Sequence, residues 1–286
     1  MKEITPHGYQ TTSVSTILGH LTQLDGLQNL TPNLTPTIAH SAPTGAGKTI
    51  TMIHLVEQLI RGFDGTPRPD LRVLWVSDSP QLNAQTCTKF QRYSDEVDNS
   101  TYIIDDGNFD EEHLRPGAVG FINTQKLARP GLLLQRGDGR HYTFWDTMNN
   151  TLRDHFNNTV VIIDEAHLGW GLNSRGHSTI LSRFLDSQAD GATLARPPKV
   201  VGISATPQRF LTHCENIQQN PVPVNTNIEH VRVTGALKDD QVTHFGQDFD
   251  AFLTQAASQF FTMSEDWREY HDENQDTQLI TPLLCI

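Results

Sequence analysis

The stretch Ala42-Pro43-Thr44-Gly45-Ala46-Gly47-Lys48-Thr49 decides the fold. An apolar-leaning run at 37–40 precedes it, and apolar residues at helical spacing over 52–59 follow it. A strand, a glycine-rich loop and a helix in this order are the context that turns a phosphate-loop pattern into a mechanism. We therefore predict a phosphate loop here, in a variant in which Ala42 replaces the usual first glycine.

The residue types in this loop suit the binding of ATP and Mg²⁺. Gly45 and Gly47 let the backbone curl so that successive N–H groups point at phosphate oxygens. The helix that starts near Lys48 adds the positive end of its dipole. Lys48 can contact the β- and γ-phosphates, and the Thr49 hydroxyl can ligate Mg²⁺. The predicted cofactor-binding residues of the loop are Thr44, Gly45, Ala46, Gly47, Lys48 and Thr49.

Composition indicates a globular protein of the cytoplasm. The 286 residues are 36% hydrophobic and 19% charged, and no apolar run is long enough to span a membrane. The first residues lack an apolar signal segment, and three distant cysteines form no disulfide or metal framework. The net charge of −12 argues against a wholly basic nucleic-acid surface. It leaves room for local contacts to phosphate through loop N–H groups and a few basic residues.

Residues 1–36 are predicted to form an adenine-contacting segment with an amphipathic helix. The helix carries Val14, Ile17, Leu18 and Leu21 at helical spacing. Gln10 lies just before it, and a glutamine amide can donate to and accept from the adenine edge at once. An ordinary polar residue at a helix start is the alternative, but the position upstream of a phosphate loop favours the adenine contact.

Further apolar runs predict an α/β fold. We expect strands at 71–76, 101–104, 119–122, 159–163 and 199–203, alternating with helices. This alternation indicates a doubly wound, mostly parallel sheet with helices on both faces. We also expect a polar excursion at about 128–150, a strand at 229–233 and an amphipathic helix from Phe249. The motifs follow strand ends, where such sheets bind their ligands.

Two of these strands end in residues that suit phosphoryl transfer. The strand at 159–163 leads into Asp164-Glu165-Ala166-His167. Asp164 can hold Mg²⁺, and Glu165 can orient and deprotonate an attacking water. His167 could relay the nucleotide state to Ser204 and Thr206, which follow the next predicted strand. A surface acidic turn at 164–167 and a plain strand-end turn at 204–206 are the alternatives. The occurrence of both motifs, in this order after a phosphate loop, favours a catalytic site.

The chain resembles the first RecA-like domain of superfamily 2 helicases and translocases with a DEAH-box motif. The resemblance rests on the order of four motifs, at Gln10, 42–49, 164–167 and 204–206. The amino-acid sequence at 121–127 and 202–210 looks most like the helicase part of type III restriction (Res) subunits and related phage-defence ATPases. The resemblance implies an ATP-dependent motor on nucleic acid, with double-stranded DNA favoured over RNA. It also implies restriction or phage defence as the setting, with partner subunits of such a system.

The same resemblance implies a nucleic-acid-facing set of residues, for which a plain strand–helix connection is the alternative. That set is Ser79, Gln85, Thr124, Gln125 and Lys126.

The resemblance also implies a domain organisation. We predict the RecA-like domain at 37–278 and the start of a missing second RecA-like domain at 279–286. In this family the second domain supplies an arginine finger, which contributes orders of magnitude to phosphoryl transfer. We therefore expect weak ATP binding and slow hydrolysis from the chain alone.

The sequence is also compatible with two other functions. One is a different P-loop ATPase of the AAA+ or transporter type, against which the Ser-Ala-Thr segment at 204–206 argues. The other is a non-catalytic, nucleotide-gated scaffold or protein-binding module, which the acidic net charge keeps in view. The intact Lys48, Thr49, Asp164 and Glu165 favour catalysis.

Overall fold

The computed structural model describes residues 1–30, 35–107, 109–127, 131–136, 139–168, 180–185, 194–236 and 249–273. The chain divides into two compact units, Met1–Leu237 and Lys238–Ile286. All predicted site residues belong to the first unit. The described part of the second unit is the helix α8 (Phe249–Glu273). The predicted start of another domain at 279–286 lies outside the described residues.

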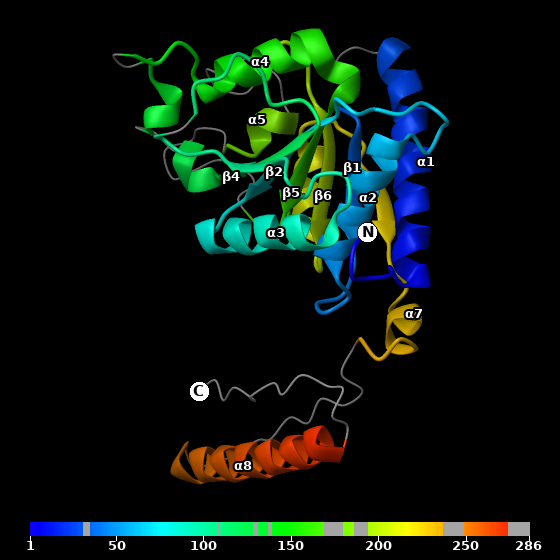
Figure 1. Cartoon of the computed structure of the whole chain (residues 1–286), viewed down its shortest axis with the longest axis vertical. Coiled ribbons are helices and arrows are strands. Elements are labelled where there is room, and N and C mark those ends of the chain that lie inside the picture. Colours follow the sequence, from blue (N-terminus) through cyan, green and yellow to red (C-terminus); the bar gives the residue numbers. More distant parts are fainter. Residues whose placement is uncertain are drawn as a thin grey trace. The chain divides into compact units, whose positions relative to one another are not determined.

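The first unit is built on one seven-stranded sheet, in which all the pairings are parallel. Its order is β3-β4-β2-β5-β6-β1-β7, so the chain returns to the middle of the sheet after building one side (Figure 1). The prediction of a doubly wound α/β sheet is confirmed. The strands are β1 (Thr37–Ser41), β2 (Arg72–Ser77), β3 (Thr101–Ile103), β4 (Ala118–Asn123), β5 (Thr159–Asp164), β6 (Lys199–Ser204) and β7 (Val222–Asn225).

Helices cover both faces of this sheet. The core on one face contains side chains of α1 (Gly8–Leu30), α2 (Lys48–Arg61) and α3 (Pro80–Tyr93). The core on the other face contains side chains of α4 (Phe144–His155), α5 (Ser182–Leu185) and α6 (Gln208–Asn216). Figure 1 shows α4 and α5 across the sheet from α3. Among the described residues, no helix is both long and apolar enough to cross a membrane.

The helix α1 carries the apolar face that its sequence predicts. Val14, Ile17, Leu18 and Leu21 are all buried in the first core. The helix begins at Gly8, earlier than expected. Gln10 therefore lies inside the first helical turn and not before the helix, which brings its side chain toward the neighbouring phosphate loop.

The region after β6 departs from the prediction in two ways. The expected strand at 229–233 is wrong, because Ile228–Arg232 forms the short helix α7. The Asn227 side chain accepts a hydrogen bond from the Glu229 amide at 2.8 Å and so caps that helix. The strand β7 comes earlier and contains Pro223. A proline disfavours a central strand but is tolerated at the sheet edge, where β7 lies.

Part of the predicted excursion at 128–150 packs onto the sheet. The Thr143 and Asp146 side chains each accept a hydrogen bond from the other's backbone N–H, which starts α4. Leu133, Phe144 and Met148 are then fully buried in the second core. These apolar side chains hold the described part of the excursion against the strands that carry the site.

Candidate active site

The strand register brings three motifs to one edge of the sheet. Ser41 of β1 pairs with Ser204 of β6, and Ile203 of β6 pairs with Asp164 of β5. The Ala42 amide also donates to the Ser204 carbonyl at 3.2 Å. Because neighbouring strands lie about 4.8 Å apart, the ends of β1 and β5 are separated by roughly 10 Å. The phosphate loop and the two acids therefore lie on the same edge, on either side of β6.

The phosphate loop has the backbone that its glycines predict. Gly45 and Gly47 have φ angles of 89° and 69°, in the left-handed region that favours glycine. The Ala46 amide donates to the Pro43 carbonyl at 3.1 Å and closes a tight turn. Lys48 is the first residue of α2, so the free N–H groups of that helix start at the loop. This geometry suits an anion.

Lys48 lies over the loop and within electrostatic range of its neighbours. Its Nζ donates to the Ala42 carbonyl at 3.5 Å, at the limit of a hydrogen bond. Its positive charge acts to lower the pKa of Asp164 and the pKa of His40. The ammonium group is therefore near both the loop and the acid, and only weakly held.

The two acids of β5 differ in their surroundings. Burial, and then the charge of Glu165, raise the pKa of Asp164 to about 6. The Asp164 Oδ1 accepts a hydrogen bond from the Glu165 amide at 2.9 Å. Glu165 has a φ of 48°, an uncommon conformation for a residue other than glycine. Such backbone strain is typical of functional sites.

The donor atoms at this edge fit Mg²⁺. The predicted ligands are the Thr49 hydroxyl and the Asp164 carboxylate, and hard oxygen donors are what this ion prefers. Asp164 is a largely buried acid beside a second acid, with Lys48 among the charges that oppose the rise in its pKa. A divalent cation would relieve that repulsion, so the residues suit the ion.

His167 connects the second acid with the end of β6. Its Nδ1 lies 3.2 Å from Glu165 Oε2 and 2.9 Å from Ser204 Oγ. Ser204 Oγ in turn accepts a hydrogen bond from the Thr206 amide at 3.0 Å. One ring nitrogen thus faces both groups, donating to Glu165 or accepting from Ser204 according to its tautomer. The predicted relay has a continuous path here and stays a prediction.

Gln10 contacts the loop itself. Its Oε1 accepts from the His7 amide at 2.9 Å, and its Nε2 lies 3.3 Å from both the Ala46 and Gly47 carbonyls. These partners fix the orientation of the amide, which is only 3% exposed. Gln10 Nε2 already has two carbonyl acceptors within the protein, so the adenine contact stays a prediction.

Tyr9 is a loop-contacting residue that the sequence analysis missed. Its hydroxyl donates to the Ala46 carbonyl at 3.1 Å. The position beside Gln10 was the only signal in the sequence that could have pointed to it.

The predicted nucleic-acid residues lie at the ends of β2 and β4 and come together only in part. Thr124 and Gln125 line a cavity of about 310 Å³ that reaches Asp164 and Glu165. Lys126 does not line it and donates from Nζ to Asp106 at 2.9 Å.

The two remaining predicted residues lie apart from that cavity. Ser79 stands at the start of α3, where its hydroxyl donates to Gln81 Oε1 at 3.1 Å. Gln85 is exposed on α3, and neither residue lines the cavity.

A parallel sheet that brings a phosphate loop and a strand-end acid pair to one edge defines the class: a RecA-like domain of the P-loop type. The family described as "Type III restriction enzyme, res subunit" matches residues 3–209, which is most of the chain. The chain belongs to that family, and the resemblance inferred from its motifs is confirmed.

Solved structures of the UvsW helicase of bacteriophage T4 are similar at low identity. The first is 14% identical over 78% of this chain and 60% of that chain, with a TM-score of 0.43. The second is 14% identical over 72% of this chain and 31% of that chain, with a TM-score of 0.36. The chain thus spans less than two thirds of either UvsW chain. These scores add nothing to the argument from topology and family. The comparison with curated proteins finds no significant match.

Proposed function

We propose that this chain binds ATP–Mg²⁺ and hydrolyses ATP as the motor part of a helicase or translocase that acts on double-stranded DNA. One observation carries the proposal: β6 separates the phosphate loop from the Asp164–Glu165 pair by a single strand. A triphosphate bound at the loop would extend toward both acids. The RecA-like fold and the family agree with this reading.

The residues at this edge have distinct roles in the proposed reaction. The loop amides and Lys48 would bind the phosphates, and Thr49 and Asp164 would hold Mg²⁺, which would neutralise charge on the transferred phosphoryl group. Glu165 accepts a proton from the attacking water. His167 lies 3.2 Å from Glu165 and holds that carboxylate in place.

The nucleic acid, the cellular process and the compartment are proposed from the family. We propose duplex DNA as the track, restriction or phage defence as the process, and the cytoplasm as the compartment. A nucleotide-gated scaffold is the second candidate. It is favoured by the net charge of −12 and by the pairing of Lys126 with Asp106, an acid of the chain itself.

Isothermal titration with ATP–Mg²⁺ tests the first step. We expect binding by the full chain, and a rise in Kd of about tenfold to a hundredfold for Lys48→Ala, since hydrogen bonds to charged groups are the strong ones. Lys2→Ala is the control, because it removes an exposed ammonium that pairs with Asp98. Equal affinities in the two variants would contradict the proposed site.

Phosphate release in the presence of duplex DNA, measured on a longer chain that carries a second RecA-like domain, separates the motor from the scaffold. A motor should hydrolyse ATP several-fold faster with DNA, and the stimulation should fall as salt screens the phosphate contacts. Nucleotide binding without any DNA-dependent turnover would favour the scaffold.

A further inference from the structure

The outer side of the phosphate loop is covered by two segments that are distant in sequence. Tyr9, Ala42, Ala46 and Val231 form a small buried cluster, against which Ala236 packs. The cluster is distinct from the two cores on the faces of the sheet. It joins the first turn of α1, the loop, and residues 228–236, which we name the α7 segment. The phosphate loop is therefore packed against α1 and the α7 segment on the side away from the two acids.

One hydroxyl group links these parts. Tyr9 is 7% exposed, and its hydroxyl donates to the Ala46 carbonyl at 3.1 Å. Burial raises the pKa of Tyr9, so the phenol keeps the proton that it donates. The side chain of Thr234 lies close enough to this hydroxyl to act against the rise in the pKa of Tyr9. Thr234 belongs to the α7 segment, where its Oγ1 lies 2.7 Å from the Val231 carbonyl.

The two left-handed glycines of the loop show how closely it is held. A Cβ added at Gly47 would lie 2.7 Å from Gln10 Nε2, which is too close for any real Cβ. A Cβ added at Gly45 would lie 3.2 Å from the Ala236 carbonyl oxygen. One glycine is thus approached by α1 and the other by the α7 segment. At Gly47 a side chain would force Gln10 to move, and at Gly45 the contact would be tighter than most real Cβ contacts.

The direction of these bonds matters for phosphate binding. Tyr9 and Gln10 both contact carbonyl oxygens of the loop, at Ala46 and Gly47. Phosphate oxygens are bound by the N–H groups of such loops and not by their carbonyls. Anchoring the carbonyls on the outer side therefore favours the loop conformation that keeps the amides available for the ligand.

We propose that Tyr9 is a positioning residue that ties the phosphate loop to the α7 segment, so that nucleotide binding and ordering of that segment strengthen each other. The inference rests on the proposed nucleotide site but names a residue and a segment outside it. Coupling of this kind is reciprocal: if the tie improves nucleotide affinity, bound nucleotide stabilises the segment to the same extent. The first compact unit ends immediately after this segment, at Leu237.

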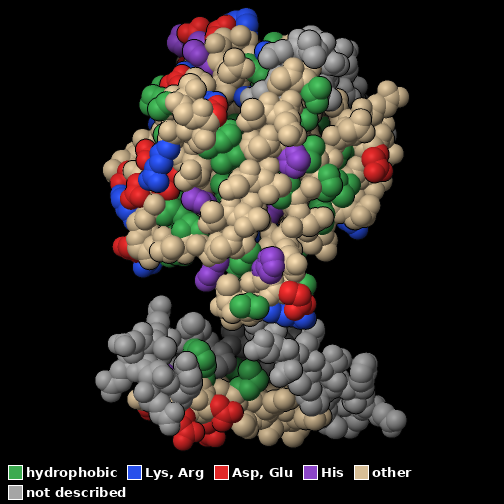
Figure 2. All heavy atoms as spheres, turned by 90° about the vertical axis from the view of Figure 1, so that its right-hand side faces the viewer, with side chains coloured by type: hydrophobic (Ala, Val, Ile, Leu, Met, Phe, Trp, Pro, Cys, Tyr) green, Lys and Arg blue, Asp and Glu red, His purple; other side chains and the backbone are tan. Residues whose placement is uncertain are grey.

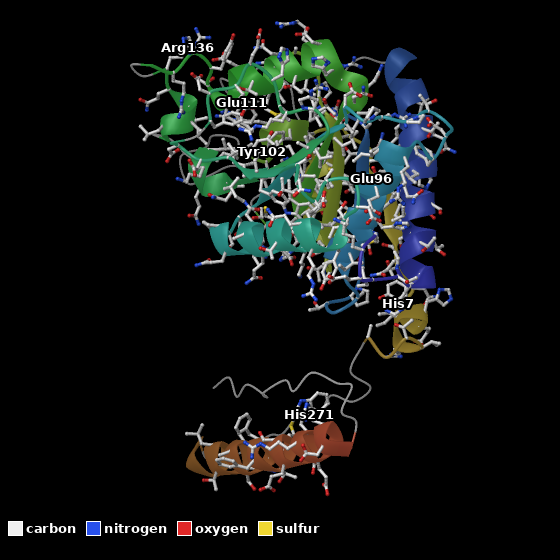
Figure 3. All side chains as sticks on the ribbon, viewed as in Figure 1. His7, Glu96, Tyr102, Glu111, Arg136 and His271 are labelled. Atoms are coloured by element: carbon white, nitrogen blue, oxygen red, sulfur yellow. The ribbon has the colours of Figure 1, made fainter. Side chains whose placement is uncertain are left out.

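The hydroxyl of Tyr9 can be tested apart from its ring. The ring stacks on His7, with centroids 5.5 Å apart and planes 13° from parallel. Figure 3 shows His7 beside α7. Tyr9→Phe retains this stacking and removes only the hydroxyl, while Thr234→Val removes the neighbouring hydroxyl of the α7 segment at nearly constant volume. The matched controls are Tyr93→Phe, in a ring packed on the first core, and Thr22→Val, whose Oγ1 donates to the Leu18 carbonyl.

Two measurements on the full chain test the tie. Titration with a non-hydrolysable ATP analogue and Mg²⁺ should show a Kd raised by about threefold to tenfold in Tyr9→Phe, the effect of one hydrogen bond. Hydrogen exchange over 226–236 should slow on addition of the analogue in the wild type and in both controls. That slowing should be lost in Tyr9→Phe and Thr234→Val. Combining the two substitutions should add little, because both break the same link.

The outcomes separate this inference from the proposed function. If the wild type binds no analogue, the nucleotide site fails, but exchange in the nucleotide-free proteins still decides on the tie. Faster exchange over 226–236 in Tyr9→Phe than in Tyr93→Phe would support it. Equal exchange in these two variants, with or without nucleotide, would overturn it. Circular dichroism melts verify that every variant is folded.

Discussion

Two regions of the same sheet edge, the phosphate loop and the ends of β2 and β4, differ in how far they are preorganised for ligand binding. At the phosphate loop, Tyr9 and Gln10 bond to backbone carbonyls and not to the N–H groups that would bind phosphate. At the ends of β2 and β4, side chains with predicted contacts to nucleic acid bond to the chain's own acceptors. Gln125 donates to the Asp78 carbonyl at 3.4 Å, and Lys126 is paired with Asp106.

The difference indicates that phosphate binding is built into the backbone, whereas nucleic-acid binding requires side chains to exchange partners. A backbone cradle costs little reorganisation when the ligand arrives. Exposed ion pairs are weak and sensitive to salt, so they can open readily. On the face in Figure 2, the coloured Lys and Arg side chains gather at the margins, and the middle carries mostly uncharged groups.

The largest effect is expected at the water-activating acid. Glu165→Gln keeps the size of the side chain but removes the base, so ATP hydrolysis should fall by about 10²–10⁴-fold. ATP–Mg²⁺ affinity should change little, since the loop and Lys48 are intact. Steady-state phosphate release, with a second RecA-like domain present, and titration calorimetry measure the two quantities. A parallel loss of binding would mean that Glu165 belongs to the binding site and not to the chemical step.

The buried His40 beneath the loop should make stability depend on pH. His40 is fully buried, its Nδ1 lies 3.1 Å from the Val224 carbonyl, and burial lowers its pKa from 6.5 to about 4. The unfolded chain therefore takes up this proton first as the pH falls. The contribution of neutral His40 to the free energy of unfolding is fully present above pH 6.5. It is lost as the pH falls toward 4, and the loss is up to about 3 kcal/mol.

His40→Asn isolates this contribution, because an amide can still donate to Val224 but does not titrate. Denaturant unfolding at about pH 7 and about pH 5 should show a smaller loss for the variant than for the wild type. The nearby positive charge of Lys48 acts in the same direction as burial and is present in both proteins. An identical loss in the two proteins would show that His40 does not titrate in this range.

A smaller effect is expected from filling the space behind the loop. Gly47→Ala places a Cβ against Gln10 and imposes a left-handed φ on alanine, so the unfolding free energy should fall by about 1–3 kcal/mol. Gly65→Ala is the control, because its φ of +83° has open space around it. Gly47→Ala should lower the unfolding free energy more than Gly65→Ala does, and this difference should become smaller when Gln10→Ala is added. Equal losses at the two glycines would mean that Gln10 does not press on the loop.

The sequence was sufficient for features in which chemistry demands fixed residue types. A phosphate cradle needs glycines and a lysine at set spacing, and buried parallel strands need continuous apolar runs. The loop at 42–49 and the acids after β5 could therefore be predicted, and the register places them at one edge. The functional roles of these residues stay predictions until nucleotide binding is measured.

The remaining features depend on contacts that no local pattern encodes. Tyr9 and Thr234 meet only because α1 and the α7 segment pack on the same loop. The strand β7 was missed because Pro223 disfavours a central strand, and only the sheet order shows that it lies at the edge. The helix α7 was missed because apolar residues in 229–233 also fit a strand, while the cap at Asn227 decides for the helix.

The smallest predicted effect probes the nucleic-acid side of the comparison. The Lys126–Asp106 pair is about one third exposed on both partners, and ion pairs that water can reach contribute at most about 1 kcal/mol. If Lys126 contacts a DNA phosphate, Lys126→Ala should weaken duplex binding by about twofold to fivefold and reduce the slope of log K against log salt by roughly one.

Asp106→Asn makes that prediction sharper, because it releases the ammonium without removing it. Duplex affinity, measured by fluorescence anisotropy over a salt series, should then rise slightly while the salt slope is unchanged. Lys2→Ala, which breaks the Lys2–Asp98 surface pair, serves as the control for a general change in charge. If Lys126→Ala and Lys2→Ala behave alike, the Lys126–Asp106 pair is a structural feature of the β4 end. The track must then contact another part of the domain, and the two regions differ in kind and not only in degree of preparation.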